Sequence, residues 1–215
     1  MDNLENYILS HSTPRQDVLD WIERQTHLRT NYPRMLAGFE VGKLLGTISE
    51  MLRPKRALEL GTFTGYSSIC IAAGLTEGGR LDAVEINDEL EDLIREGYRK
   101  AGVEDRIRLI IGDSKAVLPT LEETYDLVYI DANKREYPDY LGIVMGDSGN
   151  APLVHSGSWI IADNVLWDGK VYEEHPKSDA QTRGIIRFND MVQADPRLEN
   201  YILPLRDGWN VIKVK

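Results

Sequence analysis

Short apolar runs alternate with amphipathic segments from residue 56 onward, and this alternation constrains the fold more than any other feature of the chain. Five of the runs are rich in aliphatic residues and precede a glycine or an acidic turn, which is typical of buried parallel strands. They are residues 56–60, 81–86, 107–111, 126–130 and 158–162. The segments between them, such as 88–100, carry apolar residues at helical spacing beneath a charged face. The pattern predicts an α/β fold, a doubly wound sheet with helices on both faces.

The two ends of the chain add a hairpin and a helical segment. Residues 199–204 and 209–214 read as strands joined by the turn 205–208, in which Asp-Gly favours a hairpin. We expect this antiparallel pair to close one edge of the sheet. Residues 1–52 are helical in pattern, broken near Pro33, and are placed to cap the open end of the sheet. Residues 1–215 are expected to form a single domain.

Charge and composition narrow the classes of partner. The formal net charge of -10 repels polyphosphate backbones and favours a small-molecule substrate over nucleic acid. A single cysteine excludes an intramolecular disulfide and, with only four histidines, argues against a Cys/His zinc site, so any metal should be bound by oxygen. Without a long apolar span or a signal-peptide pattern, we expect a cytoplasmic protein that does not contact membranes.

A glycine-rich turn follows the first strand. Residues 59–67 read ELGTFTGYS and lead into a helix. Glycines at such a turn let a ligand approach the backbone at the carboxyl edge of the sheet. The spacing from Gly61 to Gly65 lacks the middle glycine of the dinucleotide fingerprint, which argues against a bound pyrophosphate.

The next two strand ends carry polar residues that suit an adenosine. Glu85 ends the second strand, where a carboxylate can accept both hydroxyls of a ribose. Asp113 and Ser114 follow the third strand and offer polar groups to an adenine edge. Each feature alone is equally typical of an ordinary turn or helix cap. Their occurrence at three successive strand ends favours the ligand site.

Acidic and amide side chains end the fourth and fifth strands. Asp131 follows one strand, and Asp163 and Asn164 follow the other. Because parallel strands end at the same edge, these oxygens are expected to converge, and such a set suits Mg²⁺ or a similar hard cation. Taken singly, Asp163 could cap a helix and Asp131 could hold a loop.

Lys134 lies three residues after Asp131 and has the reach to point back to the same place. Beside a phenol held by a cation, a lysine can take the proton or stabilise the phenoxide. The alternative is a solvated side chain, since the chain has 25 basic residues.

Several strings together carry a family resemblance that runs from about Met35 to the C-terminus. They are ALELGTFTGYS at 57–67, YIDANK at 129–134, ADNVLW at 162–167, and the tail from QTR at 181–183 through FN at 188–189, DPR at 195–197 and LPL at 203–205 to DG at 207–208. The chain resembles the cation-dependent class I O-methyltransferases, the group that contains the caffeoyl-CoA and catechol O-methyltransferases. The resemblance implies a Rossmann-like, mostly parallel sheet of seven strands with an antiparallel C-terminal hairpin. It also implies a homodimer and S-adenosylmethionine bound across the carboxyl edge.

The resemblance implies roles for residues at matching positions. Cofactor contacts are expected from Ala37, Glu59, Gly61, Thr62, Ser67, Glu85, Ser114, Asp131 and Asn133. Asp131, Asp163 and Asn164 match the ligands of a divalent cation, with Mg²⁺ expected before Mn²⁺ or Ca²⁺. Lys134 matches the general base, and Trp167 and Asp168 match a loop that faces the acceptor.

Two features depart from the family pattern. Asn133 replaces the second aspartate of the more usual Asp-Ala-Asp-Lys, which removes one negative charge near the cofactor. Residues 145–150 look like an insertion before the fifth strand. The first 34 residues match least, and since they help to shape the acceptor pocket in this family, the acceptor is left open.

The expected reaction is an in-line displacement in which a hydroxyl oxygen attacks the sulfonium methyl group. Catechols suit it because two adjacent hydroxyls can chelate one ion. One alternative is methylation of hydroxylated uridine in tRNA, served by a basic rim at Arg53, Lys55 and Arg56. A nicotinamide-dependent oxidoreductase is disfavoured by the glycine spacing and the clustered acids. A cofactor-binding protein without catalysis is disfavoured because the acids and Lys134 are all retained.

Overall fold

The computed structural model describes residues 3–173 and 179–215, in which one mixed sheet has the strand order β3-β2-β1-β4-β5-β7-β6. The strands are β1 Arg56–Leu60, β2 Arg80–Glu85, β3 Ile107–Ile111, β4 Tyr125–Ile130, β5 Val154–Asp163, β6 Leu198–Leu203 and β7 Trp209–Val214. Strands β1 to β5 pair in parallel, and β7 is antiparallel to both β5 and β6. The predicted fold class is confirmed.

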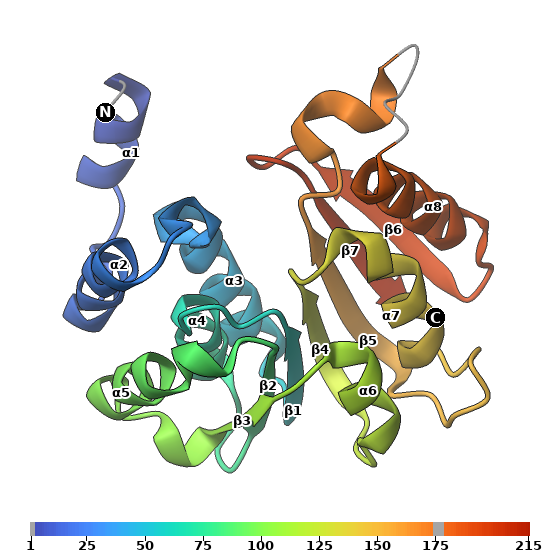
Figure 1. The fold of residues 1–215 in the computed structure, drawn as a ribbon, viewed down its shortest axis with the longest axis horizontal. Helices are drawn as coiled ribbons and strands as arrows, with labels where there is room; N and C mark the ends of the chain where they lie inside the picture. The colour runs from blue at the N-terminus through green and yellow to red at the C-terminus, as the bar shows by residue number, and fades with distance from the viewer. Residues whose placement is uncertain (1–2, 174–178) are drawn as a thin grey trace.

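Two layers of helices cover the two faces of the sheet because strand side chains alternate between them (Figure 1). Ala57 belongs to one core and Leu58 to the other. The first face is covered by α2 Asp17–Arg29, α3 Gly38–Leu52, α4 Tyr66–Gly74 and α5 Glu91–Ala101, and the second by α6 Ser114–Val117, α7 Tyr137–Val144 and α8 Ala180–Ala194. None of the helices described is long and apolar enough to cross a bilayer.

The predicted strand boundaries agree with the structure to within one residue except at the start of β5. This strand begins at Val154 and not at 158, and its register against β4 shifts between Tyr125 and Leu127. The additional residues 155–157 are exposed and polar or glycine, so no apolar run marks them. The expected helix 88–100 is a 3-10 turn, Asp88–Leu90, followed by α5.

The N-terminal segment has two breaks, at 11–16 and at 30–37, and only the second was predicted. Helix α1, Asn3–Ser10, precedes the first break, and a 3-10 turn, Pro33–Met35, lies in the second. Helices α2 and α3 lie along a face of the sheet, with α3 packed on α4. A buried hydrogen bond of 2.9 Å joins the hydroxyls of Thr26 and Thr64 and ties α2 to the glycine-rich turn.

Residues 145–150 form a loop that docks away from the carboxyl edge of the sheet. The side chain of Asp147 pairs with Arg197 at 2.7 Å, just before β6. The amide of Asn150 donates to the carbonyl of Ile143 at 2.9 Å. The loop is therefore anchored on the second helical face.

Candidate active site

A pocket of about 850 Å³ opens at the carboxyl edge of the sheet, where β1 and β4 lie side by side and the strand order reverses. Ligands of open α/β sheets bind at such a switch point. Of the predicted site residues, Glu59, Thr62 and Ser67 do not line this pocket. The others line it: Ala37, Gly61, Glu85, Ser114, Asp131, Asn133, Lys134, Asp163, Asn164, Trp167 and Asp168. The structure thus brings most of the predicted site together.

The backbone at Gly61 forms part of the pocket wall. Gly61 has a φ of 90°, which favours glycine, and a Cβ there would overlap the carbonyl oxygen of Asp131. The ends of β1 and β4 can approach this closely only because position 61 has no side chain. This contact sets the distance between the glycine-rich turn and Asp131.

Glu59 lies beneath the glycine-rich turn and does not reach the pocket. It is fully buried and accepts hydrogen bonds from the hydroxyls of Thr62, at 3.2 Å, and Ser68. Tyr98 donates to Ser68 at 2.8 Å. Thr62 and Ser67 are also buried. These groups support the turn from below, and burial raises the pKa of Glu59 to about 7.

This raised pKa predicts a pH-dependent stability. The unfolded chain loses the Glu59 proton near the usual 4.5, whereas the folded chain holds it to about 7. Relative to a Glu59→Gln variant, the free energy of unfolding of the wild type should therefore fall as pH rises between these values, by on the order of 3 kcal/mol, and stay level above them. Urea unfolding of both proteins without cofactor over this pH range measures the difference. If the unfolding free energies of the two proteins changed with pH in parallel, Glu59 would not be protonated in the folded chain.

Glu85 presents a fixed carboxylate to the pocket. Its two oxygens accept hydrogen bonds from the backbone N–H groups of Phe63, at 2.7 Å, and Asn87, at 2.8 Å. Burial raises the pKa of Glu85, and these donors oppose the shift. An ionised carboxylate has about four acceptor sites. Two of these acceptor sites therefore hold the carboxylate in place, and the remaining acceptor sites are left for the hydroxyls of a ligand.

Asp163 and Asp131 place two carboxylates on the opposite wall. Asp163 accepts hydrogen bonds from the hydroxyl of Tyr129, at 2.8 Å, and from the backbone N–H of Asn164, at 2.6 Å. Burial, and then the charge of Asp131, raise the pKa of Asp163 to about 6. Two like charges in a partly desolvated site are stabilised by a cation between them.

Hard oxygen donors at this wall fit a hard divalent cation. Asn164 has a left-handed backbone, with φ of 60°, and the next residue, Val165, is held by hydrogen bonds to Gly208 and Asn189, each 3.0 Å long. In residues 3–173 and 179–215, no three His, Cys, Asp or Glu side chains are grouped to hold a metal. The predicted set has only two carboxylates, so it depends on the Asn164 amide and on oxygens from outside the protein.

Lys134 is buried beside these acids, with 8% of its surface exposed. Its Nζ donates hydrogen bonds to Asp131 Oδ1, at 2.6 Å, and to the hydroxyl of Tyr137, at 2.9 Å. The alternative of a solvated surface lysine is therefore wrong. The side chain does point back to Asp131, as the spacing predicted.

Among the residues not predicted from the sequence are Arg206 and Asp207, which line the pocket and whose contacts are distant in the chain, and Tyr137, which is fully buried and contacts Lys134. Arg206, in the hairpin turn, donates to the carbonyl of Ala37 at 2.6 Å across 169 positions. Asp207 accepts from the backbone of Asp168 at 2.6 Å. Tyr137 gave one local signal, since it follows Lys134 by three residues as Lys134 follows Asp131.

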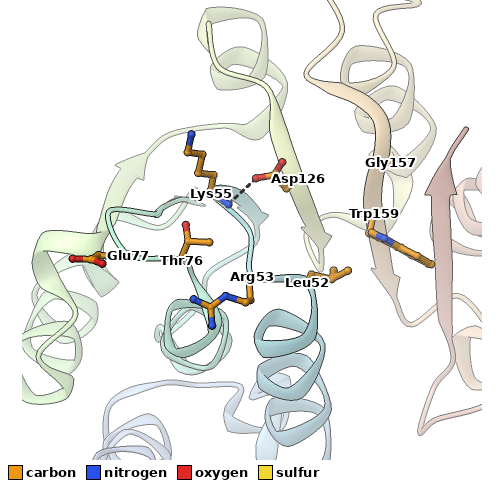
Figure 2. Close-up of a pocket in the computed structure, with 8 residues that line it drawn as sticks. All are labelled: Leu52, Arg53, Lys55, Thr76, Glu77, Asp126, Gly157 and Trp159. Carbon is orange, nitrogen blue, oxygen red and sulfur yellow. Dashed lines mark hydrogen bonds between the residues drawn. The ribbon is translucent and has the colours of Figure 1, made fainter.

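The basic rim considered for tRNA lies at the opposite edge of the sheet. Arg53 and Lys55 line a separate, open hollow of about 420 Å³ near the amino ends of β1 and β4 (Figure 2). The backbone N–H of Lys55 donates there to Asp126 at 2.7 Å. Arg56 begins β1 at the same edge. Because the acidic residues of the larger pocket follow the carboxyl ends of the strands, this rim does not border them.

Comparisons with known proteins agree with this geometry. The family model described as O-methyltransferase matches residues 9–215. The chain is 31% identical to caffeoyl-CoA O-methyltransferase 2 of Populus trichocarpa, over 96% of this chain and 86% of the relative. It is 32% identical to a catechol O-methyltransferase of Niastella koreensis, over 76% and 73%.

A solved structure shows the same arrangement of elements. The O-methyltransferase of Bacillus cereus in complex with SAH superposes with a TM-score of 0.90 at 27% identity, covering 99% of this chain and 97% of that one. The matches leave the nicotinamide-dependent alternative without support and confirm the resemblance found in the sequence. The chain belongs to the O-methyltransferase family.

Proposed function

We propose that this protein transfers a methyl group from S-adenosylmethionine to a hydroxyl of a small, catechol-like aromatic acceptor, with the help of a divalent cation. The observation that carries the proposal is the shared pocket: Glu85 lines it from the end of β2, on one side of β1, and Asp131, Asp163 and Lys134 line it from the ends of β4 and β5, on the other side. A carboxylate for the ribose and an acidic wall with a buried lysine are what the two substrates require. The relative from Bacillus cereus was solved with SAH, which supports the choice of methyl donor.

In this proposal Asp131, Asp163 and Asn164 would hold the cation; their oxygen donors suit Mg²⁺, Mn²⁺ and Ca²⁺ alike, and Mg²⁺ is the ion we propose first. A bound cation supplies Lewis acidity and a template for two adjacent oxygens. The burial of Asp163 and the nearby charge of Asp131, which together raise the pKa of Asp163, support this assignment. Full occupancy of the cation site requires an ionised Asp163. The hydrogen bonds that Tyr129 and the Asn164 backbone donate to Asp163 favour this ionised form.

Lys134 carries the proton transfer. Its Nζ accepts the proton of the acceptor hydroxyl, and the oxygen attacks the methyl carbon as the bond from that carbon to sulfur breaks. S-adenosylhomocysteine and a methyl ether are the products, and the proton stays on Lys134 until solvent removes it. Trp167 and Asp168 line the same pocket and are proposed to face the acceptor ring. Ala37, Gly61, Ser114 and Asn133 are proposed as further cofactor contacts.

Glu85→Ala should weaken binding of S-adenosylmethionine by about 1.5 to 3 kcal/mol, because charge-assisted hydrogen bonds to the ribose are lost. Calorimetric titration of the cofactor measures the change. Glu77→Ala, at the hollow on the opposite edge, is the matched control and should bind normally. Unchanged affinity in Glu85→Ala would remove the ribose assignment.

The function as a whole is tested with methyl-labelled S-adenosylmethionine. The acceptors are a panel of catechols and undermodified tRNA, each with and without chelator. Metal-dependent labelling of a catechol supports the proposal. Labelling of tRNA alone would instead support methylation of tRNA, an alternative that the position of Arg53 and Lys55 does not favour.

A homodimer, implied by the family resemblance, is also proposed. Supporting it are partly exposed apolar side chains on the same face of the sheet, among them Leu52 at the end of α3, Trp159 on β5 and Val211 on β7. Tyr201 on β6 is 66% exposed. Light scattering tests this, with a mass of twice 24.4 kDa expected.

A further inference from the structure

The hydroxyl of Tyr137 contacts three segments of the site. Tyr137 is the first residue of α7 and is fully buried. Its oxygen lies 2.9 Å from Lys134 Nζ, 3.1 Å from the carbonyl oxygen of Ile130 and 3.0 Å from that of Asp163. One phenol therefore joins the end of β4, the end of β5 and the buried lysine.

The direction of these hydrogen bonds follows from the chemistry of the partners. A carbonyl oxygen can only accept, so the single hydroxyl proton of Tyr137 is directed toward Ile130 or Asp163. The oxygen then has lone pairs left for one more donor. Lys134 must be that donor, and Tyr137 takes one N–H of its amine.

A second N–H of Lys134 is taken by Asp131 Oδ1 at 2.6 Å. With two acceptors fixed around Nζ, the remaining direction of this tetrahedral nitrogen is confined, and Lys134 lines the pocket. We propose that Tyr137 is a positioning residue that, together with Asp131, holds Nζ of Lys134 with this remaining direction toward the acceptor hydroxyl. This inference rests on the proposed function, in which Lys134 accepts a proton.

Packing holds the phenol in place independently of its hydroxyl. The ring of Tyr137 meets Phe188 of α8 edge to face, with 5.4 Å between centroids. Gly184 of the same helix lies against the backbone of Lys134 so closely that a Cβ would overlap its carbonyl oxygen. Removal of the hydroxyl alone should therefore leave the ring and the backbone where they are, while it frees the amine of Lys134 and the carbonyl oxygen of Ile130 or Asp163 from their hydrogen bonds to it.

The test is Tyr137→Phe, alone and combined with Lys134→Ala. Tyr137→Phe should lower kcat about 10-fold, the effect of one hydrogen bond to a group that becomes charged. The KM for S-adenosylmethionine and the calorimetric affinity for Mn²⁺ should stay unchanged. In the Lys134→Ala background the same substitution should cost nothing further, since its effect passes through the amine.

Tyr125→Phe is the matched control. Tyr125 is also buried on β4, but its hydroxyl donates to Asp82 at 2.6 Å near the amino end of that strand. The control should lower the unfolding temperature and leave kcat unchanged.

Three results would overturn the inference without touching the base role of Lys134. The first is wild-type kcat in Tyr137→Phe while Lys134→Ala is impaired, which would leave the proposed function intact. The second is an equal loss of rate in both backgrounds. The third is weaker Mn²⁺ binding in proportion to kcat, which would show that the hydroxyl acts through the end of β5. Undiminished turnover in Lys134→Ala would instead overturn the base role itself, and the inference with it.

Discussion

Methyl transfer by this protein should disappear in excess chelator and return on addition of Mg²⁺ or Mn²⁺. The reason is the wall formed by Asp131, Asp163 and Asn164, where burial and like charge favour a bound cation. Asp163→Ala should lose at least roughly 10²-fold in rate, and added metal should not rescue it, because two remaining ligands hold a hard cation poorly. Rates are measured with a catechol acceptor across a metal titration.

Metal binding itself supplies a second measurement. Calorimetry with Mn²⁺ should show binding to the wild type and none to Asp163→Ala at the same concentrations. Asp147→Ala is the control, because Asp147 pairs with Arg197 in the 145–150 loop and does not line the pocket. Full activity in chelator would exclude the metal-dependent mechanism.

Lys134→Ala should lower kcat by roughly 10² to 10⁴, the usual contribution of a general base, with little change in cofactor affinity. The loss should shrink for acceptors with more acidic hydroxyls, because an oxygen that is already ionised needs no base. Steady-state kinetics on a series of substituted catechols measures both effects. Lys100→Ala, on the exposed surface of α5, is a control of the same kind and should behave as wild type.

The acidity series separates two roles for Lys134. An equal fall in rate for weakly and strongly acidic acceptors would indicate that the side chain orients the acceptor. Undiminished turnover would leave its ion pair with Asp131 as a structural contact and nothing more.

The central strands β1, β2 and β4 were predictable because they are buried on both faces along nearly their whole length, and a doubly buried strand shows as an apolar run. The site at the carboxyl edge followed from the same topology, since parallel strands end together. The start of β5 was not predictable in this way, because His155 and Ser156 are exposed and polar. Pairing with Tyr125 on the neighbouring strand extends β5 there, and the local sequence does not encode it.

Glu59 shows a second limit of the sequence. It precedes the glycine-rich turn, which marks it as a candidate cofactor contact, but in the structure it alternates with Leu58 and Leu60 and lies on the Ala57 side of β1. Its partner there is Ser68 on α4. The sequence shows where a side chain lies along a strand. Whether that side chain is buried depends on the helices that pack over it, which the local sequence does not show.

The hairpin turn at Arg206 and the loop at Ala37 are joined by one hydrogen bond over the pocket. The loop follows α2, which Thr26 ties to the glycine-rich turn. The candidate reactive groups lie at the strand ends, but part of the pocket wall is formed by these two peripheral segments. Exchange of residues 32–37 and 205–208 between relatives is therefore a route to altered acceptor choice that leaves the chemical groups on the strand ends unchanged.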